Sequence, residues 1–483
     1  MIRKIGFMRF SRFQGKLNHF FNRRQFLTTG AIGLTSSLAM VQPWKAVMAA
    51  KKTSDSVHGP LTITDIEKHV IHPNYVDWHH YKLNHYYGPN KRTIYVVHTN
   101  KGFYGLGEGS NEPQEVLDKY IGTSPFDWVG DETSIPMAKA MYDLMGKAAQ
   151  VPVYKLFGQR YRRWVPVGSW TVSTHPSAMA EAVEKYSAMG YTWMKYHLSP
   201  FENVFDQLEA MERVAPKGFK LLFDLTRFHH YGHNADLVER ISRSPIAGCF
   251  EDPLDPTDID DYIDLRKSIR LPILIHGSKI QYTFDVLRQA ADGYIIGHHK
   301  LGIVMRRAGL FAAANVPFTI QWVGGQITRA MVCHMQAAFK TANFHFGNGS
   351  EILDSDVVKE RLEPVNGFLR VPEGPGLGVT LDREALEQLK QNRPPEQPPY
   401  ILRTRFKNGT IMYYLMRPPK TSHFMVLPHR WRLIPLSFDS PLSTDYWDDD
   451  GTPEYRAMFK RLETCLLYTS DAADERSSVD LGG

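Results

Sequence analysis

The clearest indication of the fold comes from two stretches of the sequence, Lys220-Leu221-Leu222-Phe223-Asp224 and Gly248-Cys249-Phe250-Glu251-Asp252-Pro253. Each contains a short apolar run followed by a carboxylate. Such runs, separated by segments with helical spacing, are typical of parallel strands that are buried on both faces. The carboxyl ends of parallel strands meet at one edge of the sheet, so we expect Asp224 and Glu251 to lie side by side.

The same alternation of strand and helix extends over residues 165–360. It predicts an α/β fold, a parallel (β/α)8 barrel of the TIM type, with its chemistry at the carboxyl ends of the strands. A doubly wound open sheet has a similar rhythm, but no glycine-rich phosphate fingerprint follows the first strand, which disfavours dinucleotide binding. The expected strands are 166–172, 192–198, 220–225, 248–251, 272–276, 293–298, 317–322 and 343–346, and the expected helices include 178–189, 205–214 and 327–340.

Residues 61–164 have a different pattern, which predicts an α+β capping domain. Alternating residues at 93–99 and 103–108 flank a turn at Asn100-Lys101-Gly102, which indicates a hairpin, and 134–149 have helical spacing. The turn-rich stretch 366–382 is expected to return to this domain, so that 361–392 complete the cap and fold against the hairpin.

The sequence after the cap consists of a linker and an extension. Residues 393–399 form a stiff proline-rich linker, and the extension reaches residue 464. An Asn-Gly turn within 404–415 indicates a second hairpin. We assign the extension no chemistry and expect it to serve packing or oligomer contacts.

The two ends of the chain are expected to lie outside the working fold. Residues 1–49 resemble a twin-arginine export signal, with Arg23-Arg24-Gln25-Phe26-Leu27, an apolar stretch and small residues for cleavage, which predicts a periplasmic protein. A cytoplasmic basic tail and an uncleaved anchor are the alternatives. Residues 465–483 back-translate to a sequencing adapter that has been read as coding sequence, so we expect no function there and a true C-terminus that is missing.

Charge and composition exclude several classes of protein. Hydrophobic residues at 43% and charged residues at 22% exclude a disordered chain. The formal net charge is +6, but residues 1–49 hold eight Lys and Arg and no acid, while 465–483 carry a net charge of −3. Without these ends the charge is about +1, which gives no electrostatic footprint for nucleic acid. No apolar run of transmembrane length follows the signal.

Three cysteines make no disulfide framework and no cysteine-based zinc site. Cys465 lies in the adapter-like segment. Cys249 and Cys333 are expected to be small buried hydrophobic residues.

Candidate catalytic residues occur at the ends of two expected strands on opposite sides of the barrel. Lys195 and His197 end the second strand on one face, and His298 and Lys300 follow the sixth. Lysine and histidine are general bases when their surroundings bring the pKa near neutrality. A solvated histidine-rich loop is the alternative for the sixth strand. Asp224 and Glu251 offer the carboxylate oxygens that Mg²⁺ prefers.

Several segments, which occur in the expected order along roughly residues 61–392, resemble the mandelate racemase/muconate lactonizing group of the enolase superfamily. They are Gly102–Glu108, Ala140–Lys147, Pro152–Gly158, Phe250–Pro253 and Val371–Gly378. The resemblance implies a modified barrel with an α+β cap and Mg²⁺ held by carboxylates on strands three, four and five. It also implies abstraction of the proton alpha to a carboxylate, which gives a metal-stabilised enediolate.

The chain departs from the pattern of this group at three positions and matches it at a fourth. The third carboxylate is absent, and His276 is the only replacement as a metal ligand beside Asp224 and Glu251. The Lys-x-Lys of the second strand is Lys195-x-His197. Gln321 stands where racemases carry a histidine on the seventh strand, and glutamine cannot be a base, so we assign it to substrate binding. Glu351 matches the acid that hydrogen-bonds the substrate carboxylate.

These residues support three hypotheses. The first is a metal-dependent lyase or isomerase, foremost an acid-sugar dehydratase, with a divalent metal such as Mg²⁺ as cofactor, a small carboxylate as substrate and a homo-oligomeric assembly. The second is a non-catalytic periplasmic descendant that binds a carboxylated ligand. The third is a transition-metal enzyme, because an imidazole ligand at His276 favours Zn or Fe over Mg²⁺.

Overall fold

The structure is a computed structural model and describes residues 60–225, 231–254, 259–276, 282–418, 438–465 and 467–471. The predicted export signal, residues 1–49, lies outside the described residues. The chain divides into Met1–Pro60 and Leu61–Gly483, and the fold reported below is that of the second unit.

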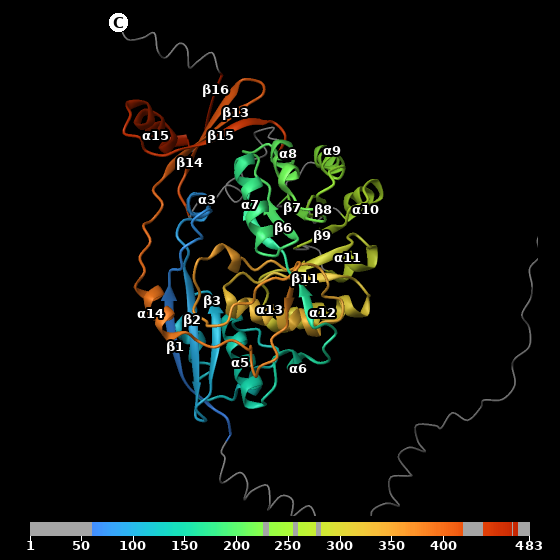
Figure 1. The fold of residues 1–483 in the computed structure, drawn as a ribbon, viewed down its shortest axis with the longest axis vertical. Helices are drawn as coiled ribbons and strands as arrows, with labels where there is room; N and C mark the ends of the chain where they lie inside the picture. Colours follow the sequence, from blue (N-terminus) through green and yellow to red (C-terminus); the bar gives the residue numbers. More distant parts are fainter. Residues whose placement is uncertain are drawn as a thin grey trace, which may run out of the picture. The chain divides into compact units, whose positions relative to one another are not determined.

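Seven parallel strands form the central sheet (Figure 1). In chain order and in sheet order they are β5 (Ser169–Val172), β6 (Trp193–His197), β7 (Lys220–Asp224), β8 (Ala247–Glu251), β9 (Ile273–Ile275), β10 (Gly293–Ile296) and β11 (Phe318–Ile320). The predicted parallel barrel is confirmed by this order, because each strand pairs with the strand that follows it in the chain.

The eighth segment of the barrel is not a regular strand, so the prediction of a strand at 343–346 is wrong. Single parallel bridges join Phe318 to Ala342 and Val167 to Phe346, and these two bridges link the segment to both edges of the sheet. The turn at Lys340-Thr341 before the segment and Gly347 and Gly349 after it leave the segment too short and too irregular for a continuous ladder.

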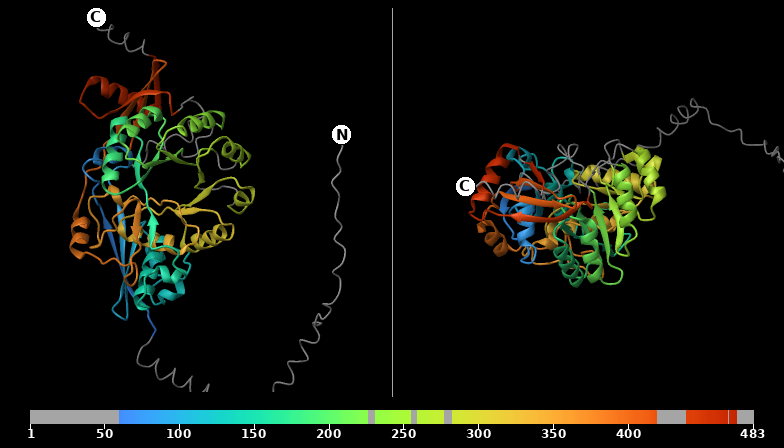
Figure 2. Two further views of the ribbon diagram at one scale, coloured as in Figure 1. Left: turned by 45° about the vertical axis from the view of Figure 1, so that its right-hand side comes forward. Right: turned by 90° about the horizontal axis from the view of Figure 1, so that it is seen from above.

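Helices follow the strands and lie outside them (Figure 2). They are α7 (Pro176–Ala188), α8 (Val204–Val214), α9 (Tyr231–Ile241), α10 (Ile259–Ser268), α11 (Tyr282–Arg288), α12 (Leu301–Ala313) and α13 (Gln326–Ala338). The predicted helices 178–189, 205–214 and 327–340 are confirmed within two residues at each end. Local chemistry sets their starts: Pro176 opens α7, and Asn203 caps α8 by accepting hydrogen bonds from the amides of Phe205 and Asp206.

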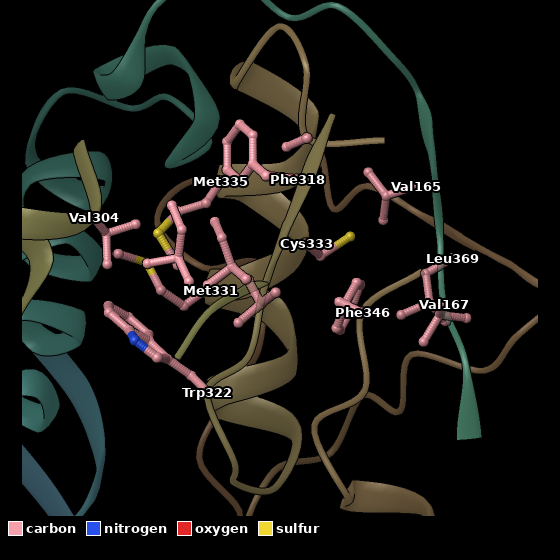
Figure 3. Close-up of a cluster of buried hydrophobic side chains, with 14 of the residues drawn as sticks. Val165, Val167, Val304, Phe318, Trp322, Met331, Cys333, Met335, Phe346 and Leu369 are labelled. Atoms are coloured by element: carbon pink, nitrogen blue, oxygen red, sulfur yellow. The ribbon is translucent and has the colours of Figure 1, made fainter. Parts of the chain in front are cut away.

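The main hydrophobic core lies between the barrel and its covering helices. Helix α13 is buried along its whole length, and Figure 3 shows its Met331 and Met335 on the side of Trp322 and its Cys333 on the side of Val165 and Phe346. Cys249 and Cys333 are free and buried, as predicted. Burial raises the pKa of both thiols, so both stay protonated and inert.

The cap begins with an antiparallel sheet of β1 (Ile63–Ile71), β2 (Arg92–Thr99) and β3 (Tyr104–Gly109), in which β2 and β3 are the predicted hairpin. Its other elements are α3 (His80–Tyr87), α4 (Gln114–Leu117), η1 (Pro125–Trp128), α5 (Ile135–Ala148), α6 (Tyr154–Phe157) and α14 (Arg383–Gln391). The fully buried Asp143 of α5 accepts hydrogen bonds from the amides of Leu106 (2.9 Å) and Leu377 (2.8 Å). One carboxylate therefore joins the hairpin, the helix and the return segment.

The transition between cap and barrel is a two-stranded antiparallel sheet. It pairs β4 (Trp164–Pro166) with β12 (Phe368–Arg370), and η2 (Ser350–Ile352) precedes β12 in the chain.

The C-terminal extension folds as a four-stranded antiparallel sheet with one helix. The sheet order is β15 (Pro441–Trp447), β13 (Tyr400–Phe406), β14 (Thr410–Met416) and β16 (Leu467–Asp471), and the helix is α15 (Pro453–Cys465). The hairpin predicted within 404–415 is confirmed. Strand β16 lies within the adapter-like segment and pairs with the open edge of β14, so residues 467–471 take part in the sheet. The origin of that segment stays a prediction.

Within the described residues, none of the helices combines the length and the apolar character needed to span a bilayer.

Candidate active site

The side chain of Lys195 lies at the centre of the candidate site. Its Nζ is 2.9 Å from Asp224 Oδ2 and 2.6 Å from Glu251 Oε2, and all three side chains are buried. The parallel register explains this meeting, because His197 pairs with Asp224 and Asp224 pairs with Glu251 across β6, β7 and β8. The predicted proximity of the two carboxylates at adjacent strand ends is found.

These charges determine one another's protonation. Burial alone would disfavour the ammonium of Lys195, but Asp224 and Glu251 raise its pKa above the ordinary value. Burial would likewise raise the pKa of Asp224, but Lys195 and His197 hold it well below its usual range. Burial and then the charge of Asp224 raise the pKa of Glu251 to about 7. Lys195 is therefore a cation in this arrangement, and it cannot accept a proton until its partners change.

His197 and Gln321 complete this side of the site. His197 Nε2 lies 3.1 Å from Asp224 Oδ2, and Lys195 Nζ donates a hydrogen bond to Gln321 Oε1 at 3.2 Å. The ring of Trp170, on β5, meets the His197 ring edge-on with centroids 5.7 Å apart. The side chains of the site come from strands β5, β6, β7 and β8, and Gln321 directly follows β11.

His276 contacts Glu251, but the side chains of His276, Glu251 and Asp224 do not converge on one point. Its Nδ1 lies 2.8 Å from Glu251 Oε1, and its backbone amide donates to Asp252 Oδ1 at 2.8 Å. Asp252 has a φ of 44°, a left-handed conformation that holds its carboxylate under the end of β9.

The fit to a divalent metal is therefore partial. Asp224 and Glu251 converge on one cation, the Lys195 ammonium, but in the part of the chain that the structure describes no three His, Cys, Asp or Glu side chains form a metal-binding group. The predicted ligand set of Asp224, Glu251 and His276 is not assembled as a three-ligand face, and it stays a prediction.

His298 and Lys300 lie on the opposite side of the barrel mouth, after β10. His298 is exposed at the mouth but is surrounded by other groups; partial desolvation, then the neighbouring cations of His276, Lys139 and Lys195, lower its pKa to about 4. His298 is therefore neutral at pH 7 and can accept a proton. Lys300 is partly buried and directly precedes α12, so it lies at the rim.

Both carboxylate oxygens of Glu351 are engaged within the protein. Oε2 lies 2.8 Å from Arg329 Nη2, and Oε1 accepts the amide of Trp170 at 2.8 Å. Glu351 thus holds the start of β5 in this structure, and its predicted contact with a substrate carboxylate stays a prediction.

Sequence reasoning missed three side chains around the site. Trp170 could have been found from the alternation of the first barrel strand, which places it on the same face as Val172. Arg329 lies within a helix that is buried on all sides, and no local pattern distinguishes it. Lys139 is buried in α5 of the cap, where it donates to Glu108 O (2.7 Å) and Thr328 Oγ1 (2.8 Å). Its approach to the barrel depends on the docking of two domains, which the sequence does not display.

Comparison with known proteins finds similar sequences and similar folds. The family described as Enolase C-terminal domain-like matches residues 178–385. The arabinonate dehydratase of Saccharolobus solfataricus is 24% identical over 266 residues, which cover 52% of this chain and 70% of that protein. The D-galactonate dehydratase of Xanthomonas axonopodis pv. citri is 25% identical over 279 residues, which cover 53% of this chain and 73% of that protein.

Solved structures show the same fold. A mandelate racemase/muconate lactonizing family protein from Azoarcus sp. EbN1 superposes with a TM-score of 0.57 at 21% identity, over 70% of this chain and 99% of that chain. A dipeptide epimerase from Cytophaga hutchinsonii, solved with Mg and a dipeptide, gives a TM-score of 0.55 at 18% identity, over 68% of this chain and 98% of that chain. These two chains are matched almost in full, whereas about three tenths of this chain lies outside each match.

Proposed function

Because the chain belongs to the mandelate racemase/muconate lactonizing group of the enolase superfamily, we propose that it is an enzyme that dehydrates an acid sugar, or carries out a related isomerisation, after removing the proton alpha to the substrate carboxylate. The observation that carries this proposal is the placement of two imidazoles. His197 and His298 follow strands β6 and β10, four strands apart in the barrel, with a buried ammonium beside one of them.

The Lys195 ammonium is suited to bind the substrate carboxylate. An ammonium has three N–H donors, and here two face Asp224 and Glu251 while the third reaches Gln321 Oε1. The bond to Gln321 is the weakest of the three because the amide is neutral. A substrate carboxylate oxygen would replace Gln321 on Lys195, and the released Gln321 amide would then be available to the substrate's hydroxyl groups.

The two histidines divide the proton transfers of a dehydration. Neutral His298 accepts the alpha proton. The electron pair of the broken C–H bond first forms a double bond between the alpha carbon and the carboxylate carbon. It then forms a double bond between the alpha carbon and the neighbouring carbon of the chain, the beta carbon. The C–O bond of the hydroxyl on that neighbouring carbon breaks, and His197 supplies the proton with which the hydroxyl leaves as water. The resulting enol becomes a 2-oxo-3-deoxy acid. In the isomerase alternative, the proton returns to the alpha carbon instead.

We propose a divalent cation, Mg²⁺ first, as the cofactor. When bound at Asp224 and Glu251, it would supply charge neutralisation for the negative charge that develops on the substrate carboxylate. His276 would orient Glu251 through the 2.8 Å contact between them. Elemental analysis of wild type and of Asp224→Ala, Glu251→Ala and His276→Ala tests the set: the two carboxylate variants are expected to lose the metal and His276→Ala to retain it weakly.

A screen tests the activity. Metal-replete protein is incubated with a library of acid sugars, and 2-oxo acid is detected as its semicarbazone. We expect turnover of at least one acid sugar, with a loss of about 100-fold or more in kcat for His298→Asn and for His197→Asn. His175→Asn is the matched control, because this exposed histidine caps α7 and asparagine is also a good N-cap.

One observation favours a second function, a non-catalytic protein that binds a carboxylated ligand. The Lys195 ammonium lies between the two carboxylates that a metal would need. Protein that stays metal-free after incubation with Mg²⁺, Mn²⁺ and Zn²⁺, and that binds acid sugars in calorimetry without converting them, would establish this function in place of the dehydratase.

We further propose export to the periplasm by the twin-arginine route and a homo-oligomeric state. The support is the Arg23-Arg24-Gln25-Phe26-Leu27 segment and the small residues near Ala49. Replacing both arginines by lysine should retain the protein in the cytoplasm, as cell fractionation would show. Light scattering of the purified protein measures the mass of the assembly.

A further inference from the structure

The C-terminal module, residues 400–418 and 438–465, contacts two separate elements at the mouth of the barrel. The first is α3 of the cap. His85 Nε2 lies 2.8 Å from Asp448 Oδ1, and Tyr81 donates its hydroxyl hydrogen to Asp448 Oδ2 at 3.0 Å. The hydroxyl of Tyr400 donates to the backbone oxygen of His85 at 2.7 Å. The module therefore holds both side chains and the main chain of this short helix.

Aromatic packing reinforces the contact with α3. The ring of His85 stacks on Tyr446, with centroids 5.2 Å apart and planes 8° apart, and Tyr400 meets it edge-on at 4.7 Å. The His85 side chain is only 4% exposed as a result. Figure 1 shows α3 next to the strands of the module. Because α3 has only eight residues, it would be marginal alone, and these contacts fix its position.

The second contact is with the loop between β6 and α8. Phe201, in this loop, is fully buried in the apolar core of the module. The amide of Val204 donates to Phe438 O at 2.7 Å, and the side-chain amide of Asn203 donates to Pro441 O at 3.3 Å. This loop begins directly after the strand that carries Lys195 and His197. The module thus anchors the segment that follows those two residues.

Side chains of α3 that face the barrel pack against strand β5 beside the candidate site. Leu83 and Tyr86 pack with Val172 at the carboxyl end of β5. The ring of Tyr87 lies 5.7 Å from that of Trp170, and Trp170 lies 5.7 Å from His197. Ring contacts therefore join Tyr446 to His85 on one side of α3, and Tyr87 to Trp170 and His197 on the other, and the helix itself connects the two sets.

We propose that the C-terminal module is a positioning element of the active site, in which Asp448 and Tyr446 set α3 so that Tyr87 and Trp170 form an aromatic wall beside His197. This wall takes the C–H face of the polyhydroxy chain of the substrate, on the side away from its carboxylate. The part that concerns the substrate rests on the proposed dehydratase function. The part that concerns α3 and the β6–α8 loop does not.

Hydrogen–deuterium exchange of the full chain tests the positioning without any substrate. The variants are Asp448→Ala and Tyr446→Leu, and the control is Asp449→Ala, whose carboxylate only accepts the amide of Gly451 in its own turn. Circular dichroism and thermal unfolding first establish that each variant is folded. We expect exchange in residues 80–87 to rise about three- to tenfold in both variants, with the control unchanged. Unchanged exchange in α3, or a rise confined to 438–465, would overturn the proposal.

Kinetics with the acid sugar found in the screen tests the wall. Asp448→Ala is expected to raise KM about tenfold with kcat within about twofold, since binding is lost while the reacting groups stay in place. Asp448→Asn should restore most of KM, because its amide oxygen still accepts from Tyr81. An unchanged KM, or equal loss in Asp448→Asn, contradicts the wall. If no acid sugar reacts, the dehydratase proposal fails, and the exchange result still decides the role of the module.

Discussion

At the scale of single residues, Lys195 determines whether the two buried carboxylates can coexist. Its replacement by Met leaves Asp224 and Glu251 buried without a cation, so we expect the free energy of unfolding to fall by about 3 kcal/mol and turnover to be abolished. Chemical denaturation and the kinetic assay measure the two effects. Lys185→Met is the control, because Lys185 is exposed on α7, and a Lys195→Met protein as stable as this control would contradict the role of the ammonium.

Glu202 gives the stability of the protein a pH dependence. It is buried where the β6–α8 loop meets the module, and burial, then repulsion by Asp445, raises its pKa from 4.5 to about 8. Below pH 4.5 the group is protonated in both the folded and the unfolded state. Between pH 4.5 and 8 only the unfolded state releases the proton, so stability falls as pH rises, and the full penalty applies above pH 8.

Glu202→Gln removes this penalty. The Tm of the variant relative to wild type should therefore increase from pH 5 to pH 8, as differential scanning fluorimetry at several pH values would record. Glu209→Gln, on the exposed side of α8, should show no such trend. A constant difference in Tm across this range would show that Glu202 does not titrate as described.

At the scale of elements, the start of α13 depends on a side chain from the cap. Glu108 of β3 accepts hydrogen bonds from the amides of Gly325 (2.5 Å) and Thr328 (3.0 Å) and pairs with Arg92 at 3.0 Å. A negative charge at a helix N-terminus satisfies its free amides and its dipole. Glu108 therefore connects β3 to the helix that follows the seventh barrel strand.

Glu108→Gln keeps the shape of this side chain but removes its charge. We expect a loss of about 2–4 kcal/mol in the free energy of unfolding, since Arg92 is left buried without its counter-ion. Urea denaturation measures this loss against Glu115→Gln, an exposed residue of α4 that serves as the control. Equal midpoints for the two variants would refute the connection between cap and helix.

At the scale of the whole molecule, the cap is built from both ends of residues 61–392, with the barrel between them. A chain that ends at Glu363 lacks β12, α14 and Leu377, and it leaves Asp143 with an unfilled acceptor site in a buried position. We expect such a chain to lose cooperative thermal unfolding of the barrel and the cap together. Calorimetry of this truncation should show no transition like that of the full chain, and retention of the wild-type Tm would contradict one cooperative unit.

Hydrophobic periodicity in the sequence predicts most of the strands and helices. It does not predict the features that depend on contacts between segments distant in the chain. Apolar runs ending in Asp224 and Glu251 indicated strands β7 and β8 and their adjacency. The irregular segment at 342–346 was mistaken for a strand, because composition does not reveal how few ladder bonds a closing segment makes. Lys195 was identified, but its charge was not, since that depends on two carboxylates whose distances only the folded register sets.

The shared carboxylate of Asp143 also constrains the order in which the chain can mature. Its two amide partners are Leu106 and Leu377, and the whole barrel lies between them in the chain. A ribosome that has completed the barrel has not yet released residue 377, so the hydrogen bond between Asp143 of α5 and the amide of Leu377 cannot form while the nascent chain lengthens. Closure over such a long span is slow because its loop entropy must be overcome first. The cap is thus completed only after the barrel has been synthesised, although its first strand, β1, leaves the ribosome before the barrel does.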